Sequence, residues 1–365
     1  MSPVLFNEYF IPDGRKIVEV FLNVEGSLNA LSLDMIDLIQ AKLDACADDE
    51  TILALIINSA GQKAFCAGGD VVSLYQAIQG EGSSTFPECF FTREYRLDYT
   101  IHTYSKPIIC WASGLIIGGG MGLMNGCSHR IVTETSQLSM PEVTLGLYPD
   151  VGASWFLNHM PGRTGFFLGL TGNPLSAADS LFVGLADRFI HSQSYELLIS
   201  SLLAECWDQD PNIPINRVLR VLEHDSLPHM DDISLVKRHF EFIQRVTDKD
   251  SVDEVVTAII AEPSEDKWIT RAQKVMSHGS PLAMHIIKQQ LHITRHMSLK
   301  QVFMSELILS VQCCQHREFP EGIRALLIDK DRDPDWTYKN INDVEMSHLA
   351  EFFISPWRHN PLENM

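Results

Sequence analysis

The sequence predicts an α/β protein, in which strands and helices alternate through the first half of the chain and helices follow. Two continuous apolar runs, Ile52–Asn58 and Pro107–Ala112, are typical of strands that are covered on both faces. Apolar residues at helical spacing lie between these runs, and they dominate the chain from about Ser176 onward. Strands that alternate with helices indicate a layered α/β core.

The first elements expected along the chain are a strand and a helix. Lys16–Val24 (KIVEVFLNV) has the β-branched, alternating character of a strand. Ser32 is a suitable helix N-cap. The apolar residues that follow it recur at the spacing of one helix face: Met35, Ile36, Ile39, Leu43 and Cys46. The strand Ile52–Asn58 comes next.

The middle of the chain is rich in glycine. Gly114–Gly126 (GLIIGGGMGLMNG) follows the second apolar run, and its apolar residues predict a helix that starts at the glycines. Arg130–Thr133 and Gln137–Ser139 are expected to form short strands.

The remainder of the chain is expected to be mostly helical. Ser176–Gly184, Ile286–Leu291 and Leu299–Cys313 have helical periodicity. We therefore expect an α/β part over residues 1–190 and a helical part over residues 191–365. Within the helical part, two polar stretches are expected to be loops: Asp208–Pro214 and Asp225–Asp232.

The composition excludes several classes of function. The formal net charge of −19 argues against nucleic-acid binding and against anionic membranes. Eight cysteines without a C-x-x-C pair indicate reduced thiols, and no targeting segment is visible. We expect a cytoplasmic protein, or one of the mitochondrial matrix if a transit peptide has been removed.

Familiar catalytic and metal motifs do not account for the chain. It has no G-x-x-x-x-G-K-[ST], HExxH or G-x-S-x-G motif. His292 and His296 could lie on one helix face, but without a third ligand nearby a solvated surface explains them better. Cys66 has no histidine in its local sequence, so a buried inert thiol is the better interpretation. No metal site is expected.

Three segments remain, and they share glycine turns and acids. They are AFCAGGD (Ala64–Asp70), IGGGMG (Ile117–Gly122) and MPEVTLGLYPDVG (Met140–Gly152), which contains Glu142 and Asp150. Consecutive glycines and helix starts leave N–H groups open to a ligand. Two such turns that face each other would form an oxyanion hole, and a nearby carboxylate could act as base or nucleophile.

In combination and in this order, the three segments resemble the signature blocks of the crotonase (enoyl-CoA hydratase/isomerase) superfamily. The similarity extends from Asn29–Met35 through Leu170–Ile190 and resumes at Ser280–Leu291 (SPLAMHIIKQQL). The resemblance implies the ClpP/crotonase-like fold, in which repeated ββα units spiral into a core, here with a helical C-terminal region. It also implies an acyl-CoA substrate.

The resemblance also assigns roles to glycines. Gly69 and Gly119 would supply the two oxyanion N–H groups, and Ala67 would lie in the loop that meets the CoA adenine. Their neighbours Gly68, Asp70 and Gly122 would line the same CoA-ester site, together with the two acids. Coenzyme A is then part of the substrate, and no further cofactor is required.

The acids distinguish branches of this superfamily. Its hydratases use two glutamates, and at the first of these positions this chain has Gly122, which cannot handle a proton. Glu142 occupies the second position, and Asp150 stands where hydratases usually have a small residue. This combination resembles the 3-hydroxyisobutyryl-CoA hydrolases, a thioesterase branch of valine catabolism.

That branch implies roles for both carboxylates. Glu142 would activate water or attack the thioester carbonyl, and Asp150 would bind the 3-hydroxyl group or position the water. Two alternatives remain open: an enoyl-CoA hydratase or isomerase, and a non-catalytic acyl-CoA-binding protein. Relatives often form trimers, so a homo-oligomer is also left open.

Overall fold

The computed structural model describes residues 2–208, 210–231 and 233–365. It divides into two compact units that interleave along the chain. Unit 1 contains residues 1–69, 97–138 and 175–234, and unit 2 contains residues 70–96, 139–174 and 235–365. Among the described residues, no helix combines the length and the apolar character needed to cross a membrane.

Unit 1 is built around two sheets. The larger sheet has the strand order β1-β2-β3-β5-β7-β9. Its strands are β1 (Val4–Phe10), β2 (Lys16–Leu22), β3 (Ile52–Ser59), β5 (Ile108–Ala112), β7 (His129–Val132) and β9 (Arg188–Phe189). All neighbouring pairs are parallel except β1 and β2, which form an antiparallel pair. The smaller sheet consists of β4 (Ala64–Cys66), β6 (Leu115–Ile117) and β8 (Gln137–Ser139).

The strands repeat in pairs, one in each sheet. β3 and β4, β5 and β6, and β7 and β8 each add one strand to the larger sheet and the next strand to the smaller one. Helices follow two of these pairs: α2 (Val71–Ile78) after β4 and α4 (Gly119–Asn125) after β6. This is the ββα repeat that the resemblance implied, and the predicted α/β class is confirmed.

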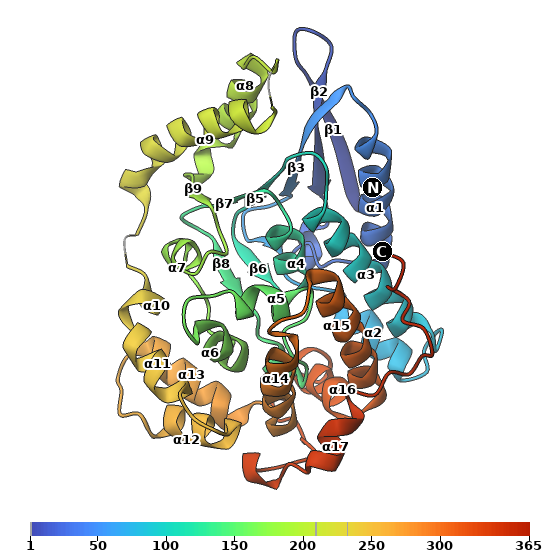
Figure 1. Ribbon diagram of the computed structural model, residues 1–365, viewed down its shortest axis with the longest axis vertical. Helices are drawn as coiled ribbons and strands as arrows, with labels where there is room; N and C mark the ends of the chain where they lie inside the picture. Colours follow the sequence, from blue (N-terminus) through green and yellow to red (C-terminus); the bar gives the residue numbers. More distant parts are fainter. Residues whose placement is uncertain (1, 209, 232) are drawn as a thin grey trace. The chain divides into compact units, whose positions relative to one another are not determined.

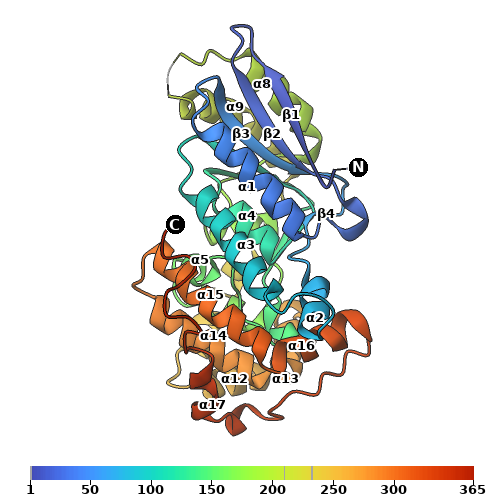
Figure 2. The same cartoon turned by 90° about the vertical axis from the view of Figure 1, so that its right-hand side faces the viewer.

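Helices cover both faces of the larger sheet (Figure 2). On one face lies α1 (Leu33–Ala47), whose predicted cap is present because the Ser32 side chain accepts from Met35 N at 3.3 Å. On the other face lie α8 (Tyr195–Ala204) and α9 (Asn212–Ser226), which share a buried apolar cluster with the strands. The central strands β3 and β5 therefore consist almost entirely of buried apolar residues, as the two apolar runs in the sequence predicted.

Unit 2 is helical. Besides α2, its helices are α5 (Ala153–Asn158), α6 (Thr164–Thr171), α10 (Leu235–Arg238), α11 (Phe240–Thr247), α12 (Val252–Ala261), α13 (Lys267–His278), α14 (Pro281–Thr294), α15 (Leu299–Gln315), α16 (Glu318–Ile323) and α17 (Met346–Glu351). Most of them follow β9 in the sequence (Figure 1). The long helix α3 (Phe86–His102) contributes its first part to unit 2 and its last part to unit 1, which also contains α7 (Ala177–Phe182).

In the described chain every strand ends by Phe189, so a division of the chain at residue 190 separates the part with strands from the part with helices alone. The compact units do not follow this division. Residues 70–96 and 139–174 pack with the helices that follow residue 234, since they expose apolar faces that those helices cover. Unit 2 thus packs together segments that are distant from one another in the sequence.

Both predicted loops are partly wrong. Within Asp208–Pro214, α9 already begins at Asn212, because proline is tolerated in the first turn of a helix. Within Asp225–Asp232, α9 continues to Ser226 and a 3₁₀ turn covers Leu227–His229. Positions 209 and 232 of these two segments lie outside the described residues.

One buried side chain fixes the segment that precedes the first glycine turn. Asn29 is fully buried and adopts a left-handed backbone conformation, with φ of 55°. Its side chain accepts from Val24 N at 2.9 Å and donates to the carbonyl groups of Ala60 and Ala64, at 2.9 and 3.1 Å. It therefore satisfies three backbone groups inside unit 1.

We predict that Asn29→Ala lowers the free energy of unfolding by about 2–4 kcal/mol, because it leaves buried backbone groups unpaired and strains a left-handed residue. Urea denaturation followed by circular dichroism would measure the change. Asn23→Ala is the matched control, since Asn23 makes a single exposed bond to Ser2 O, and it should change stability by less than about 0.5 kcal/mol. Equal effects of the two variants would contradict this account.

Candidate active site

The first glycine turn follows β4 and is held by backbone hydrogen bonds. Ala67 N donates to Leu28 O at 3.1 Å, and Leu31 N donates to Gly68 O at 2.8 Å. Gly68 has a φ of +108°, which side chains rarely adopt, so this turn requires glycine. In the described part of the chain, the N–H of the next residue, Gly69, has no hydrogen-bond partner.

The second glycine turn joins β6 to α4. Gly118 has φ of 48° and ψ of −116°, and α4 begins at Gly119. The first N–H groups of a helix have no acceptor within the helix, so the Gly119 N–H is available to a ligand. A Cβ atom at Gly120 would lie 2.4 Å from Cys66 O, which means that only glycine lets α4 start this close to the end of β4.

Unit 1 brings these two turns together. β4 pairs with β6 in parallel, with Ala64 opposite Leu115 and Cys66 opposite Ile116. Since parallel strands end at the same edge, the turns that carry Gly69 and Gly119 leave the small sheet side by side. Two N–H groups from adjacent turns are what an oxyanion hole requires.

The remaining predicted residues of this region differ in what their side chains do. Ala67 is half-buried directly after β4, and Gly122 is buried within α4, where it offers no acid. Asp70 caps α2, because its carboxylate accepts from Ser73 N at 3.1 Å and from Ser73 Oγ at 2.6 Å. The Asp70 side chain is thus occupied by a local structural role.

Glu142 lies in unit 2, at the start of a 3₁₀ turn that covers Glu142–Leu145. Its side chain is 5% exposed, and its Oε2 atom is buried with no hydrogen-bond partner among the described residues. Burial raises the pKa of Glu142 well above its ordinary value, and the charge of Asp150 raises it further. A carboxylate in these surroundings binds a proton readily, as a general base must.

Asp150 is presented by an unusual turn. The two residues after it, Val151 and Gly152, are both left-handed, with φ of 53° and 82°. Asp150 is 5% exposed, and its Oδ2 accepts a hydrogen bond of 2.6 Å from the Tyr95 hydroxyl. Burial raises the pKa of Asp150 to about 6, although the Tyr95 hydrogen bond opposes this rise.

A buried glutamate on α15 holds this turn. The two carboxylate oxygens of Glu306 accept from Gly152 N at 2.7 Å and from Ser154 N at 2.9 Å. Burial raises the pKa of Glu306 to about 8, and the two N–H donors oppose the rise. Sequence analysis missed Glu306, because its partners are more than 150 residues away in the chain.

Hydroxyl groups connect Asp150 to α15. The Tyr95 hydroxyl lies 2.6 Å from Ser310 Oγ, which in turn lies 2.8 Å from the Tyr148 hydroxyl. Tyr148 also donates to Glu306 O at 2.8 Å. Residues from three separate segments thus fix the orientation of the Asp150 carboxylate.

Glu94 is a further buried acid that sequence analysis missed. It lies on α3, is 2% exposed, and has a pKa raised well above its ordinary value by burial and by the charge of Asp150. A signal was available in the sequence. Glu94 follows the buried Phe90 and Phe91 by four and three residues, so it shares their apolar helix face.

These acids form one electrostatic group in unit 2. Each of Glu94, Glu142 and Glu306 has a pKa that the charge of Asp150 raises, so ionising one carboxyl group disfavours ionising the others. The protons of these carboxyl groups are therefore shared by the group and do not belong to one residue. In the described part of the chain, none of these acids belongs to a cluster of metal ligands.

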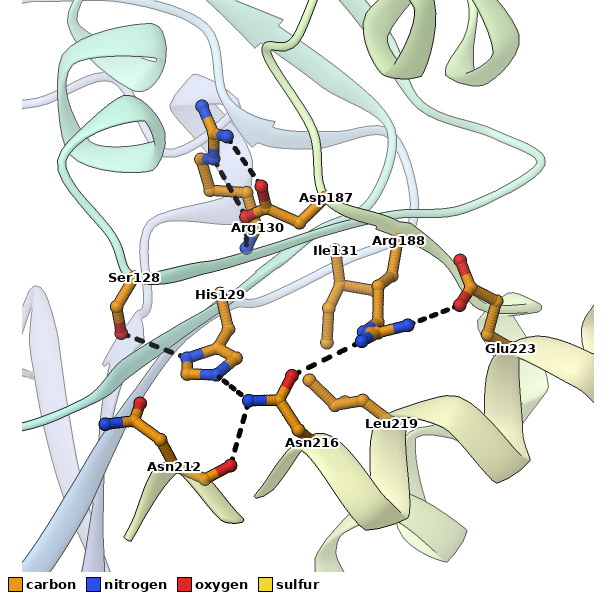
Figure 3. A pocket seen from close by; sticks show the side chains of 10 residues that line it. All are labelled: Ser128, His129, Arg130, Ile131, Asp187, Arg188, Asn212, Asn216, Leu219 and Glu223. Carbon is orange, nitrogen blue, oxygen red and sulfur yellow. Dashed lines mark hydrogen bonds and ion pairs between the residues drawn. The ribbon is translucent and has the colours of Figure 1, made fainter. Parts of the chain in front are cut away.

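Unit 1 also contains a polar pocket of about 450 Å³ between β7, β9 and α9 (Figure 3). Its charged groups are paired with one another: Arg130 with Asp187, and Arg188 with Glu223. None of the predicted site residues lines it. The pocket therefore gives no support to the acyl-CoA site.

Comparisons with known proteins agree with the resemblance seen in the sequence. The family model described as enoyl-CoA hydratase/isomerase matches residues 17–353. A protein of Danio rerio named "3-hydroxyisobutyryl-CoA hydrolase, mitochondrial" is 34% identical over 359 residues, which cover 97% of this chain and 91% of that protein. The Homo sapiens protein of the same name is 32% identical, over 92% of this chain and 86% of that protein.

Solved structures show the same fold. The crystal structure of an enoyl-CoA hydratase from Rhodobacter sphaeroides has a TM-score of 0.83 and 30% identity, with 97% of this chain and 98% of that chain covered. A carnitinyl-CoA dehydratase from Mycobacterium thermoresistibile has a TM-score of 0.88 at 24% identity, with both chains covered completely. The fold is therefore the predicted crotonase fold, and the chain belongs to the enoyl-CoA hydratase/isomerase (crotonase) family.

Proposed function

We propose that the chain is a thioesterase that hydrolyses 3-hydroxyisobutyryl-CoA, a step of valine catabolism. One observation carries the proposal: Glu142 is buried with an unpartnered oxygen and a raised pKa, beside the charge of Asp150. The names of the relatives that match nearly the whole chain support the same activity. The acyl-CoA is the substrate, and the chemistry needs no further cofactor.

In the proposed reaction, Glu142 takes a proton from water while the water oxygen attacks the thioester carbonyl carbon. The N–H groups of Gly69 and Gly119 stabilise the negative oxygen that forms. The carbon–sulfur bond then breaks, and the protonated Glu142 returns its proton to the leaving CoA thiolate. In the alternative pathway, the Glu142 carboxylate attacks the carbonyl carbon itself, and the carbon–sulfur bond breaks to give an anhydride and the CoA thiolate. Water then hydrolyses the anhydride, which restores the Glu142 carboxylate and supplies the proton that the thiolate takes up.

Asp150 would accept a hydrogen bond from the 3-hydroxyl group of the substrate. Its Oδ2 already accepts from Tyr95, and an ionised carboxylate can accept further hydrogen bonds. Glu94 carries a second buried carboxyl group, and the charge of Asp150 raises its pKa.

The proposal extends to the compartment. The vertebrate relatives are named mitochondrial, which supports a mitochondrial location rather than the cytoplasm that we expected first. Of the partners expected from the sequence, the acyl-CoA is retained in this proposal, and a homo-oligomer remains an expectation.

A thiol-release assay tests the proposed function. Purified protein should release CoA from 3-hydroxyisobutyryl-CoA, and it should not consume the double bond of crotonyl-CoA. Loss of crotonyl-CoA absorbance without thiol release would favour the hydratase alternative instead. Tight binding of both esters with turnover of neither would favour the non-catalytic acyl-CoA-binding alternative.

Glu142→Gln should reduce kcat by about 10²- to 10⁴-fold, because the amide cannot accept the proton. The apparent affinity for the ester should change little, since the side chain keeps its size. Glu241→Gln removes the same charge from an exposed site on α11 and is the matched control. An unchanged kcat in Glu142→Gln would remove Glu142 from the mechanism.

Asp150→Ala should lower kcat/KM for 3-hydroxyisobutyryl-CoA by about 10- to 100-fold more than for isobutyryl-CoA. The physical reason is the loss of a charged acceptor for the buried hydroxyl group. Measuring both esters with the same variant separates substrate recognition from damage to the site. Equal losses on the two esters would instead indicate that Asp150 positions the water.

Tyr95→Phe should move the acidic limb of the kcat/KM profile to higher pH by about one unit. The Tyr95 hydrogen bond lowers the pKa of Asp150, which is about 6. Removing this bond should raise the Asp150 pKa, so a smaller fraction of Asp150 is ionised below neutral pH. Tyr148→Phe is the control, because Tyr148 contacts Ser310 and Glu306 O but makes no hydrogen bond to Asp150. Identical profiles of the two variants would argue against the assigned coupling.

A further inference from the structure

Two histidines and a glutamate meet in unit 2, where the sequence analysis expected no metal site. His316 directly follows α15, and His348 and Glu351 lie on α17, one helical turn apart. One potential ligand atom from each side chain lies within 4.8 Å of the other two. Figure 2 shows α15 and α17 within the same group of helices.

The separation of the two imidazoles fits a metal ion. His316 Nδ1 and His348 Nε2 are 3.4 Å apart. Zinc binds histidine nitrogen at about 2.0–2.1 Å in tetrahedral geometry, which requires the two nitrogens to be about 3.3–3.4 Å apart. Glu351 is exposed, so its side chain can rotate toward the same point without disturbing buried contacts.

Neighbouring side chains orient both rings. The Tyr338 hydroxyl lies 3.0 Å from His348 Nδ1. Metal-binding histidines usually donate their other ring N–H to such a partner, which leaves Nε2 free for the metal. The His316 ring stacks on the buried Phe352 ring, with centroids 4.1 Å apart and an interplanar angle of 27°.

A simple hydrogen bond between the two imidazoles is the competing explanation. At 3.4 Å that bond would be longer than the usual 2.7–3.2 Å of N–H donors, and it would leave Glu351 without a role. A metal ion accounts for both histidines, the carboxylate and the orientation of His348 together.

We propose that His316, His348 and Glu351 form a Zn²⁺ site with its fourth position open to water. Imidazole nitrogen suits zinc, whereas Mg²⁺ and Ca²⁺ prefer oxygen ligands. The ion would connect α17 to the end of α15 and close the chain between positions that are 32 residues apart. The site contains none of the residues assigned to thioester hydrolysis, so it goes beyond the proposed function.

Titration calorimetry on the full chain, stripped of metal by a chelator, tests this proposal. Zn²⁺ should bind at one equivalent per chain with micromolar affinity, and Mg²⁺ should not bind. His348→Ala and His316→Ala should each weaken Zn²⁺ binding by tenfold or more, and Tyr338→Phe should weaken it by about tenfold. Co²⁺ in place of Zn²⁺ should give the visible absorption of a tetrahedral nitrogen–oxygen site.

His359→Ala is the matched control, because His359 also contacts a glutamate, Glu363, at 3.4 Å but has no third ligand among the described residues. This variant should keep the affinity of the parent protein. Absence of Zn²⁺ binding to the parent chain would overturn the proposal. The proposal would also be overturned if His348→Ala and His359→Ala bound Zn²⁺ equally well, or if Co²⁺ gave only the spectrum of the hydrated ion.

Discussion

Burial of ionisable groups around Asp150 is the constraint on which the candidate site depends. A carboxylate removed from water must find hydrogen-bond donors or a proton. Asp150 has the Tyr95 hydroxyl, and Glu306 has two backbone N–H groups, whereas Glu142 Oε2 has no partner among the described residues. The acid without a partner, Glu142, is the base of the proposed reaction. Asp150 and Glu306 are held in fixed orientations by their hydrogen-bond donors.

The rest of unit 2 follows from this constraint. The left-handed turn at Val151 and Gly152 exists because Glu306 binds the N–H groups that the turn exposes. A Cβ atom at Gly152 would lie 3.0 Å from Phe303 on the same helix, so the turn also packs tightly against α15. One helix from the C-terminal part of the chain therefore shapes the loop that carries Asp150.

The candidate site groups of unit 1 are backbone N–H groups. Its two glycine turns offer N–H donors that need no side chain, and close contact between Gly120 and Cys66 fixes how near α4 starts to β4. A relative named as a hydrolase and a solved structure named as a hydratase both match nearly the whole chain. A shared fold does not fix the reaction, which depends on the side chains present. In this chain Gly122 of unit 1 has no side chain, and Glu142 and Asp150 are buried acids of unit 2.

The sequence by itself determined the α/β class, the main strands and helices and the family, and it predicted Gly69, Gly119, Glu142 and Asp150 as site residues. These predictions rest on local signals, namely apolar runs, the Ser32 cap and glycines next to acids. Such signals act within a few residues, so they do not depend on which distant segments pack together. Only the tertiary structure revealed that Tyr95 and Glu306 hold Asp150 and its turn, and that His316 lies beside His348. Their contacts join segments 32 to more than 150 residues apart, and no periodicity in the sequence encodes such distant pairs. Tertiary packing determines these contacts, because a helix that packs through its apolar face also buries the polar residues on that face.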